Sequence, residues 1–284
     1  MLLGVTTHDK IKVNKQGAVA TPDLLVTEEP MEIQLLHPSL SETLSLTVTM
    51  RTPGNDFELT TGFLLAEGII NGITDLEQMF HCENVETLTI GNVVKVKLKP
   101  HVKIDSDKYA RNFTSTASCG ICGKQRLDQI TYRIDSLQGN NLNTNFEIVS
   151  KLPESLMSHQ NIFNHTGGIH ASALFSSTGE LLLSREDVGR HNALDKVIGA
   201  CLALDATLLQ QSILLVSGRI GFELVQKAAV AGIPIMVGVG APSSLAVQLA
   251  AKMDMTLIGF AKKSSFNIYT GAKRISTNRT KKIE

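Results

Sequence analysis

The sequence has few of the residues on which several large classes of protein depend. Its 284 residues include no tryptophan and only four cysteines, at positions 82, 119, 122 and 201. Four cysteines at these spacings do not make the disulfide framework of a small secreted domain. No apolar run is long enough to span a bilayer, and residues 1–15 lack the apolar core of a signal peptide. We therefore expect a protein of the reducing cytoplasm.

The chain also lacks an excess of either charge. It carries 27 basic and 27 acidic residues, so its formal net charge is zero. This balance does not favour binding to nucleic acid or to a membrane surface, although a local basic patch could still bind a phosphorylated ligand. The hydrophobic content of 43% suits one large globular domain, or a domain with an elaboration.

The first half of the chain is dominated by strand patterns. Residues 23–50 predict strands, and residues 56–67 predict a helix that ends at Gly68. Residues 85–90 and 93–98 flank Gly91-Asn92, a pair typical of a hairpin turn. A helical stretch at 125–136 and a polar, asparagine-rich linker at 139–145 complete this half.

The second half is more regular. Residues 171–175 and 180–184 predict a hairpin, and residues 188–204 predict a helix. The segments that follow are strand 213–217, helix 221–231, strand 233–237, helix 243–252 and strand 256–260. Apolar strands that alternate with helices indicate a parallel or mixed sheet covered on both faces. We expect an α/β protein in which residues 1–145 form a smaller β-rich N-terminal part and residues 146–284 form a three-layer C-terminal domain.

Two cysteines stand in the most distinctive segment, Ser118-Cys119-Gly120-Ile121-Cys122-Gly123-Lys124. A glycine follows each cysteine, and residues 111–116 before them have neither a strand nor a helix period, so we expect a mobile loop. The positive potential of Lys124 and of a following helix start would favour the thiolate form. In such a pair, one sulfur acts while the other resolves, stabilises or co-ligates it.

A structural zinc site is an alternative use of this cysteine pair. Zinc needs two further ligands here, and only His165 and His170 have a suitable mutual spacing. Other candidates for these ligands are His81, Cys82 and Cys201. A thioredoxin-like redox motif is a second alternative, but such motifs follow a strand and open a helix near a βαβ unit, whereas this pair follows an irregular run.

A zinc-dependent deaminase is a third alternative. Its signature places H-x-E before P-C-x-x-C, with the glutamate as proton shuttle. His81-Cys82-Glu83 fits the first element, but Ser118 stands where the second needs a proline. The departure argues against deaminase chemistry.

The segment His165-Thr166-Gly167-Gly168-Ile169-His170 joins two histidines to a glycine pair. Adjacent glycines let backbone N–H groups approach a ligand closely. His170 could ligate a metal, transfer a proton or hold a phosphate. It could equally be a structural histidine at a strand entrance.

The segment from Arg185 to Lys196 is densely charged and follows an apolar strand. Asp187, His191 and Asp195 recur at the i, i+4 spacing that gathers side chains on one helical face. A carboxylate beside His191 would orient its ring and raise its pKa. We expect Arg190 and His191 to face a ligand pocket, with Asp187 or Asp195 orienting the histidine. The alternative is a solvated helix start with ordinary ion pairs.

Small residues also follow two of the predicted strands. Ser217-Gly218-Arg219-Ile220-Gly221 and Gly238-Val239-Gly240-Ala241-Pro242-Ser243-Ser244 each lead into a helix. Helix N-termini attract anions, and open α/β sheets bind ligands at the carboxyl ends of their strands. Neither segment is a P-loop, but together with Arg219 they indicate a nucleotide or another phosphorylated ligand.

Several of these segments occur together in one known family. In order they are Met50-Arg51-Thr52-Pro53-Gly54, Cys119-Gly120-Ile121-Cys122-Gly123, Thr166-Gly167-Gly168-Ile169-His170, Glu186-Asp187-Val188-Gly189-Arg190-His191, Ala193-Leu194-Asp195-Lys196 and Gln226-Lys227-Ala228-Ala229. With them the chain resembles the formate dehydrogenase accessory sulfurtransferases of the FdhD family, from about residue 29 to residue 270. The charged segment 186–196 is the most specific part of the likeness.

The resemblance implies a cytoplasmic sulfur carrier, usually a homodimer, with a cytidine-deaminase-like C-terminal domain. Such carriers take sulfur from a cysteine desulfurase as a cysteine persulfide. They pass it to the bis-molybdopterin guanine dinucleotide form of the molybdenum cofactor before that cofactor enters formate dehydrogenase. By similarity, Cys119 carries the persulfide and Cys122 is its partner, and no metal site of the protein's own is expected.

The resemblance also implies a cofactor-binding segment after the last strand of the domain. It maps to Phe260-Ala261-Lys262-Lys263-Ser264-Ser265, which departs from the better-known F-C-K-P-G-R form. Only Phe260 and Lys262 match that form, and the other four positions follow from alignment alone. We add His170, Arg190, His191 and Arg219 as candidate cofactor-binding residues, with a guanine nucleotide as fragment ligand. A non-catalytic cofactor-binding chaperone and a zinc-stabilised binding module are the alternative functions.

Overall fold

The fold is described from a computed structural model, which covers residues 4–82, 91–104 and 137–277. The cysteine pair at 119 and 122, the predicted helix 125–136 and the first strand of the hairpin predicted at 85–98 lie outside these residues. No helix in the covered ranges is long and apolar enough to cross a membrane.

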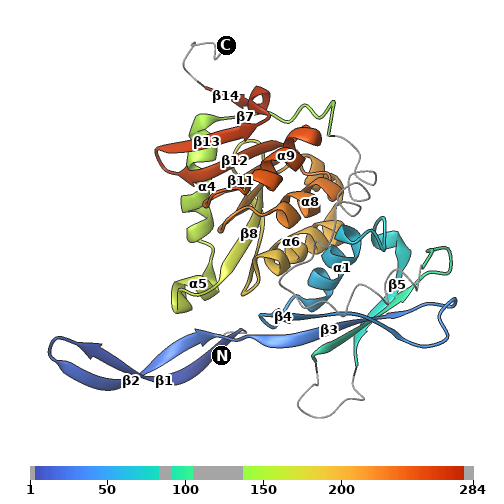
Figure 1. Cartoon of the computed structure of the whole chain (residues 1–284), viewed down its shortest axis with the longest axis horizontal. Coiled ribbons are helices and arrows are strands. Elements are labelled where there is room, and N and C mark those ends of the chain that lie inside the picture. Colours follow the sequence, from blue (N-terminus) through green and yellow to red (C-terminus); the bar gives the residue numbers. More distant parts are fainter. Residues whose placement is uncertain (1–3, 83–90, 105–136, 278–284) are drawn as a thin grey trace.

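A six-stranded mixed sheet organises the C-terminal part (Figure 1), in the order β13-β12-β11-β10-β8-β9. The three central strands β10, β11 and β12 run parallel, whereas β8, β9 and β13 pair antiparallel with their neighbours. The strands are β8 (His170–Phe175), β9 (Leu181–Asp187), β10 (Ile213–Val216), β11 (Ile235–Gly238), β12 (Thr256–Lys262) and β13 (Ser265–Thr270).

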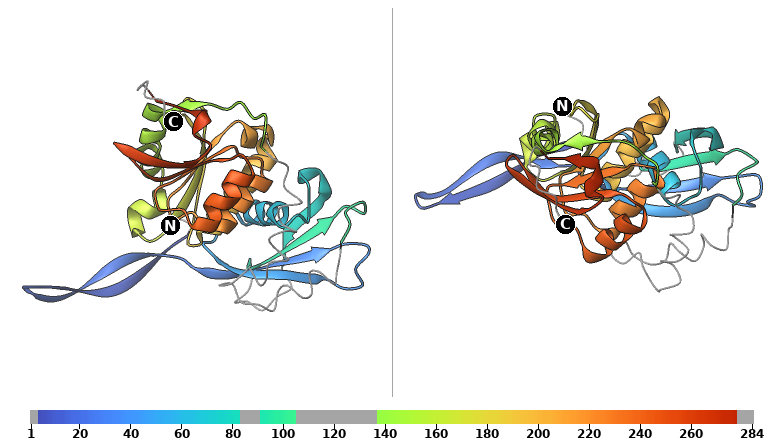
Figure 2. Two further views of the ribbon diagram at one scale, coloured as in Figure 1. Left: turned by 45° about the horizontal axis from the view of Figure 1, so that its top comes forward. Right: turned by 90° about the horizontal axis from the view of Figure 1, so that it is seen from above.

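Helices cover both faces of this sheet. One face packs on α6 (Arg190–Leu204), α8 (Phe222–Val230) and α9 (Ser244–Lys252), and the other packs on α4 (Phe146–Met157), as both views in Figure 2 show. Strand β10 shows the alternation that this requires, because Leu214 and Val216 belong to the first apolar cluster whereas Ile213 and Leu215 belong to the second. The predicted three layers are thus present.

Shorter elements complete the C-terminal part. Helix α5 (Asn161–Thr166) follows α4, and α7 (Thr207–Gln210) follows α6. A small parallel pair joins β7 (Thr144–Asn145) to β14 (Ile275–Ser276). A 3₁₀ turn at Ala272–Arg274 precedes β14.

The N-terminal part contains a four-stranded sheet of order β4-β3-β6-β5. Its strands are β3 (Glu29–Leu36), β4 (Leu44–Arg51), β5 (Leu76–His81) and β6 (Val93–Leu98), with a 3₁₀ turn at Ile73–Asp75. Helix α1 (Asp56–Ala66) lies between this sheet and α6. Strand β6 pairs in parallel with β3 and antiparallel with β5.

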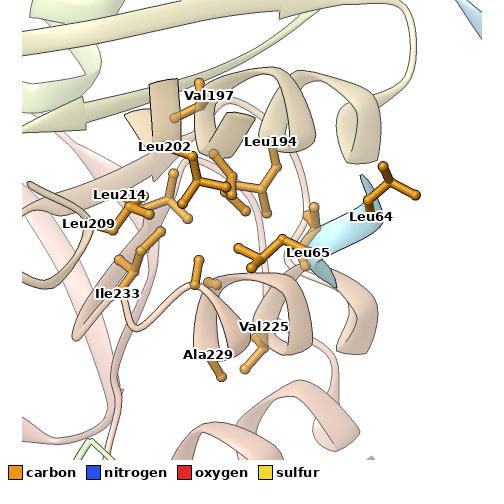
Figure 3. Close-up of a cluster of buried hydrophobic side chains, with 14 of the residues drawn as sticks. Leu64, Leu65, Leu194, Val197, Leu202, Leu209, Leu214, Val225, Ala229 and Ile233 are labelled. Carbon is orange, nitrogen blue, oxygen red and sulfur yellow. The ribbon is translucent and has the colours of Figure 1, made fainter. Parts of the chain in front are cut away.

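Helices α1 and α6 cross closely because glycine stands at both contact points. A Cβ on Gly62 would overlap the backbone of Asp195, and a Cβ on Gly199 would overlap the backbone of Glu58. Around this crossing, Leu64 and Leu65 of α1 share one apolar cluster with side chains of α6 and α8 (Figure 3). One core therefore extends from the N-terminal sheet into the C-terminal layers.

A long hairpin leaves the body of the molecule at its N-terminal end. Strands β1 (Val5–Asn14) and β2 (Gly17–Val26) pair antiparallel over their whole length and project as an arm in both figures of the whole chain. The sequence did not predict β1 or most of β2. It also did not predict α4, α5 or β13, whereas the predicted helix 56–67, the hairpin at 171–184 and the later strand–helix alternation are confirmed.

Candidate functional site

The carboxyl ends of β10, β11 and β12 form one edge of the main sheet, where the small-residue segments lie. Backbone hydrogen bonds join the three loops, since Gly240 N donates to Gly218 O at 3.1 Å and Phe260 N donates to Gly240 O at 3.1 Å. A Cβ on Gly240 would approach the backbone of Arg219 to 2.9 Å. The glycines therefore let the loops pack against one another and bring exposed Arg219 and exposed Phe260 to the same edge.

The two helix starts at this edge differ. Ser243 caps α9, because its side chain accepts a hydrogen bond from Ala246 N at 3.2 Å. Helix α8 begins after Gly221, which supplies no side-chain cap. Among the described residues, the first N–H groups of α8 thus have no capping side chain, which is the arrangement that suits an anion.

His170 reaches the same edge from the other direction. It begins β8, which runs antiparallel to β10, and its ring lies against Gly218. The next residue fixes the strand, because Ala171 N donates to Ser217 Oγ at 2.9 Å. Burial lowers the pKa of His170, and the nearby Arg190 charge lowers it further against the opposing effect of Asp187. His170 is therefore neutral near pH 7 and offers one nitrogen donor and one acceptor.

A cavity of about 500 Å³ opens beside His170. Its walls come from α4, α5, the glycine pair before β8 and the loops after β9, β10 and β11. They are mostly apolar, and the polar side chains among them are Gln160, His170 and Ser217. A largely apolar cavity with a few convergent polar groups is the usual form of a small-molecule site. The lining residues are Pro153, Leu156, Met157, Gln160, Phe163, Gly167, Gly168, Ile169, His170, Val188, Ser217 and Val239.

Arg190 and His191 form the first turn of α6. His191 Nε2 lies 3.3 Å from Glu223 Oε2 at the start of α8. Burial lowers the pKa of His191 to about 4, and the nearby Arg190, Lys227 and His170 lower it further. Arg190 Nε is buried without a hydrogen-bond partner among the residues described. The two residues thus lie near His170, although neither lines the cavity.

The predicted orientation of His191 by Asp187 or Asp195 is wrong, and so is the predicted rise of its pKa. Asp187 ends β9 instead of opening the helix, so it does not share a helical face with His191. Its carboxylate accepts hydrogen bonds from Thr52 N and Gly189 N and pairs with Lys196 Nζ at 2.7 Å. The partner of His191 is Glu223, a residue that the spacing argument did not consider.

Asp195 is held by a cation of its own. Lys227 Nζ lies 2.8 Å from both carboxylate oxygens, and the same ammonium lies 5.6 Å from the ring centre of Phe63. Burial raises the pKa of Asp195 to about 6, against the lowering effect of Lys227. Both aspartates therefore form structural ion pairs, as the alternative interpretation of this segment had it. The pairs are buried, however, whereas that alternative placed them in solvent.

The segment around Arg51 belongs to the same buried network. Arg51 is 2% exposed and binds Asp56 through Nε at 3.0 Å and Asn92 through Nη2 at 2.8 Å. Lys196 Nζ donates to the Thr52 carbonyl at 2.8 Å. Three of the segments on which the family resemblance rests therefore join the N-terminal part to the C-terminal part. The sequence analysis did not predict that these residues join the two parts. The signal in the sequence that could have indicated it is the presence of charged residues within otherwise apolar strands and helices.

We had expected the cofactor-binding segment 260–265 to follow the last strand of the domain, but a further strand, β13, comes after it. The segment forms the end of β12 and the turn into β13. Phe260 is in the left-handed region at φ 54° and 47% exposed, whereas Ala261 is buried. Lys262, Lys263, Ser264 and Ser265 are exposed, and Lys263 Nζ lies 3.3 Å from Glu154 Oε2 on α4.

The structure thus brings His170, Arg190 and His191 into one electrostatic group, and it places Arg219 and Phe260 at the same sheet edge. That any of these residues binds a cofactor stays a prediction. Cys119 and Cys122 lie outside the described residues. Within the ranges that are described, no three His, Cys, Asp or Glu side chains gather closely enough to hold a metal ion.

Comparison with known proteins places this geometry in a family. The model of the FdhD/NarQ family matches residues 26–276. A sulfur carrier protein FdhD of Streptomyces coelicolor is 46% identical over 277 residues, which cover 96% of each chain. One from Saccharolobus solfataricus is 41% identical over 271 residues, covering 95% of this chain and 98% of the relative.

A solved structure has the same fold. It is described as a formate dehydrogenase accessory protein from Desulfotalea psychrophila and superposes with a TM-score of 0.72 at 22% identity. The superposition covers 96% of this chain and 99% of the other. With the family model matching most of its length and relatives above 40% identity, the chain belongs to the FdhD/NarQ family.

Proposed function

We propose that this protein is a sulfur carrier for the maturation of formate dehydrogenase. It accepts sulfur from a cysteine desulfurase as a persulfide on Cys119 and delivers it to the bis-molybdopterin guanine dinucleotide cofactor, which is its substrate. The observation that carries the proposal is the match along nearly the whole chain to relatives named sulfur carrier proteins. The Cys119-Gly120-Ile121-Cys122 segment supplies the thiols that such a role needs.

The loading step is a thiol–persulfide exchange without net oxidation. The Cys119 thiolate attacks the outer sulfur of the persulfide on the desulfurase. A new S–S bond forms on Cys119, the S–S bond on the desulfurase breaks, and the desulfurase cysteine leaves as a thiolate. Nearby Lys124 favours the attacking thiolate. Cys122 acts as the partner thiol that resolves or stabilises the persulfide.

The sheet edge is the proposed site for the nucleotide part of the cofactor. Its phosphates suit the uncapped start of α8 and the exposed guanidinium of Arg219. Further donors come from the neutral rings of His170 and His191 and from Arg190, whose Nε has no hydrogen-bond partner in the described part of the chain. The proposed contacts of the 260–265 segment come through exposed Phe260, Lys262, Lys263, Ser264 and Ser265, with buried Ala261 supporting them.

Guanosine diphosphate serves as the probe for this site. It should raise the melting temperature, because a ligand of the native state stabilises that state. Arg219→Ala should weaken its binding about tenfold or more, since a charged hydrogen bond to phosphate is lost. Lys252→Ala, an exposed cation at the far end of α9, is the matched control and should bind like the parent protein. No heat in calorimetry at millimolar nucleotide would contradict the site.

The proposal includes three further features: the location of the protein, its oligomeric state and the type of its C-terminal fold. We infer a cytoplasmic homodimer whose C-terminal domain is cytidine-deaminase-like. The mixed sheet with helices on both faces supports the last point. The departure of Ser118 from the deaminase signature supports a carrier rather than a deaminase.

Peptide mass mapping tests the sulfur-carrying residue. After incubation with a cysteine desulfurase and cysteine, the added sulfur should lie on Cys119, and Cys119→Ala should abolish maturation of formate dehydrogenase. Cys201 is an internal control, because burial and then Asp205 raise the pKa of its thiol to about 11 and disfavour the thiolate. Cys122→Ala should retain partial activity if Cys122 only resolves the persulfide.

The alternative functions give different results. An adduct confined to Cys82 or Cys201 would contradict the assignment of Cys119. A Cys119→Ala protein that still matures formate dehydrogenase fully would favour the non-catalytic chaperone. One zinc ion per chain that is lost on Cys119→Ala would favour the zinc-stabilised module.

A further inference from the structure

The β1–β2 arm has one apolar face and one polar face. In a paired hairpin, alternate residues point to opposite sides and cross-strand partners share a side. The register pairs Ile11 with Ala20 and Val13 with Ala18, so the outer half of one face is entirely apolar. The opposite face pairs Lys10 with Thr21 and Lys12 with Val19, and Lys10 Nζ binds Asp23 at 2.6 Å.

Nothing in the described chain covers the outer half of the apolar face. Ile11 is 70% exposed and Val13 is 73% exposed, and both strands are exposed along most of their length. The arm contacts the body at its base, where β2 packs against α5. A two-stranded ribbon alone in water is at best marginally stable, so a projecting ribbon needs a second layer on its apolar face.

We propose that the arm is the dimerisation element, and that the apolar face of one arm packs against the same face of the arm of a second copy. The inference rests on the homodimer of the proposed function and names its surface. A twofold axis brings like surfaces together, which an uncharged face tolerates and a charged face does not. The outer half of the apolar face carries no charge, since Asp9 and Thr7 lie nearer the base.

The length of the arm also suits a second copy. Ten-residue strands reach about 33 Å, so two arms can overlap at their outer halves while the bodies stay apart. The two layers would then pack about 10 Å apart, as in a small β-sandwich.

Light scattering after size exclusion tests the arm with matched substitutions. The parent protein should have twice the 30.7 kDa mass of one chain. The double variant Ile11→Lys, Val13→Lys should raise the dimer dissociation constant at least about 100-fold, because it loses two buried aliphatic side chains. Val19→Lys is the control, since Val19 is 65% exposed on the opposite face and should leave the dimer intact.

Ala20→Lys, on the outer half of the apolar face, should also weaken the dimer, whereas Leu25→Lys, on the opposite face nearer the base, should not. All these side chains are solvent-exposed in the single chain, so the variants should keep its circular dichroism spectrum and fold. A dimeric double variant, or a Val19→Lys protein that dissociates equally, would overturn the arm proposal while leaving a dimer through another surface. A monomeric parent protein would overturn both the dimer and the arm. Neither result depends on sulfur transfer, which the Cys119 mapping tests separately.

Discussion

At the scale of single residues, the acidic and the basic side chains of the charged segment 186–196 have different roles. Its carboxylates are committed to structure, because Glu186 accepts hydrogen bonds from Ile162 N and Phe163 N at the start of α5 and Asp187 pairs with Lys196. Its basic side chains at the helix start have fewer partners among the residues that the structure describes, since Arg190 Nε has none there and His191 pairs with the half-exposed Glu223. Ligand binding in this segment is therefore expected of the basic side chains rather than the carboxylates.

His191 should make the protein less stable in acid. Its pKa is about 4 in the folded chain and about 6.5 when unfolded, so the unfolded chain takes up a proton first as the pH falls. The stabilisation is complete above pH 6.5 and is lost progressively between about pH 6.5 and pH 4. From pH 7.5 to pH 5, the free energy of unfolding should fall by up to about 2 kcal/mol because of this residue. Urea unfolding of the parent and of His191→Gln at both pH values measures the difference.

The variant should show a smaller loss of stability over that pH range than the parent. His170 also has a lowered pKa and remains in both proteins, so its contribution cancels in the comparison. An equal loss in the two proteins would mean that His191 titrates normally. It would also remove the reason to treat this ring as a neutral donor to a ligand.

The sequence predicted which residues are special here better than it predicted their partners. Periodicity along one segment can only relate residues of that segment, and it grouped Asp187, His191 and Asp195. Their actual partners, Lys196, Glu223 and Lys227, required knowledge of where β9 ends and how α8 packs on α6. Long-range pairing of this kind depends on tertiary packing and is not contained in local spacing.

At the scale of elements, the α1–α6 crossing connects the two parts of the chain. Gly62 and Gly199 let backbone meet backbone at this crossing, so no side chain can be added there without moving a helix. Gly62→Ala should lower the free energy of unfolding by about 1–3 kcal/mol or more, as overpacking of a core does. Chemical unfolding at constant pH measures the change. Gly199→Ala should act in the same direction.

Gly72→Ala provides the control for this prediction. No atom lies within 4 Å of a Cβ placed there, and its φ of 178° is open to any residue. It should therefore be close to neutral. A Gly62→Ala protein as stable as Gly72→Ala would show that the two helices can separate at little cost.

Element prediction succeeded where apolar periodicity was strong and failed where it was diluted. The alternation in β10, β11 and β12 and their following helices is carried by buried aliphatic residues. In strand β1 apolar and polar residues alternate only near its outer end. Most of its residues are polar, and both of its faces are exposed to solvent. Helix α4 contains Pro153, a residue that ordinarily argues against a helix interior.

At the scale of the whole molecule, one core and one buried ionic network span both parts of the chain. The main apolar cluster includes Ile33 and Leu35 of the N-terminal sheet as well as Val197 of α6 and Leu224 of α8. The network runs from Arg51 through Thr52 to Lys196. A division at residue 145 into two parts stays a prediction, but the packing leads us to expect that the two parts unfold together.

Lys196→Ala tests this coupling. Lys196 is 1% exposed and Asp187 is fully buried, so the substitution leaves the Asp187 carboxylate and the Thr52 carbonyl without their cation. Removing one partner of a buried pair costs about 3–5 kcal/mol, whereas Lys10→Ala at the exposed Lys10–Asp23 pair should cost less than about 1 kcal/mol. Because the pair joins both parts, calorimetry should show one transition moved to lower temperature in the Lys196 variant. Two separate transitions, with only one of them shifted, would show instead that the N-terminal and C-terminal parts fold independently and that the network does not couple their unfolding.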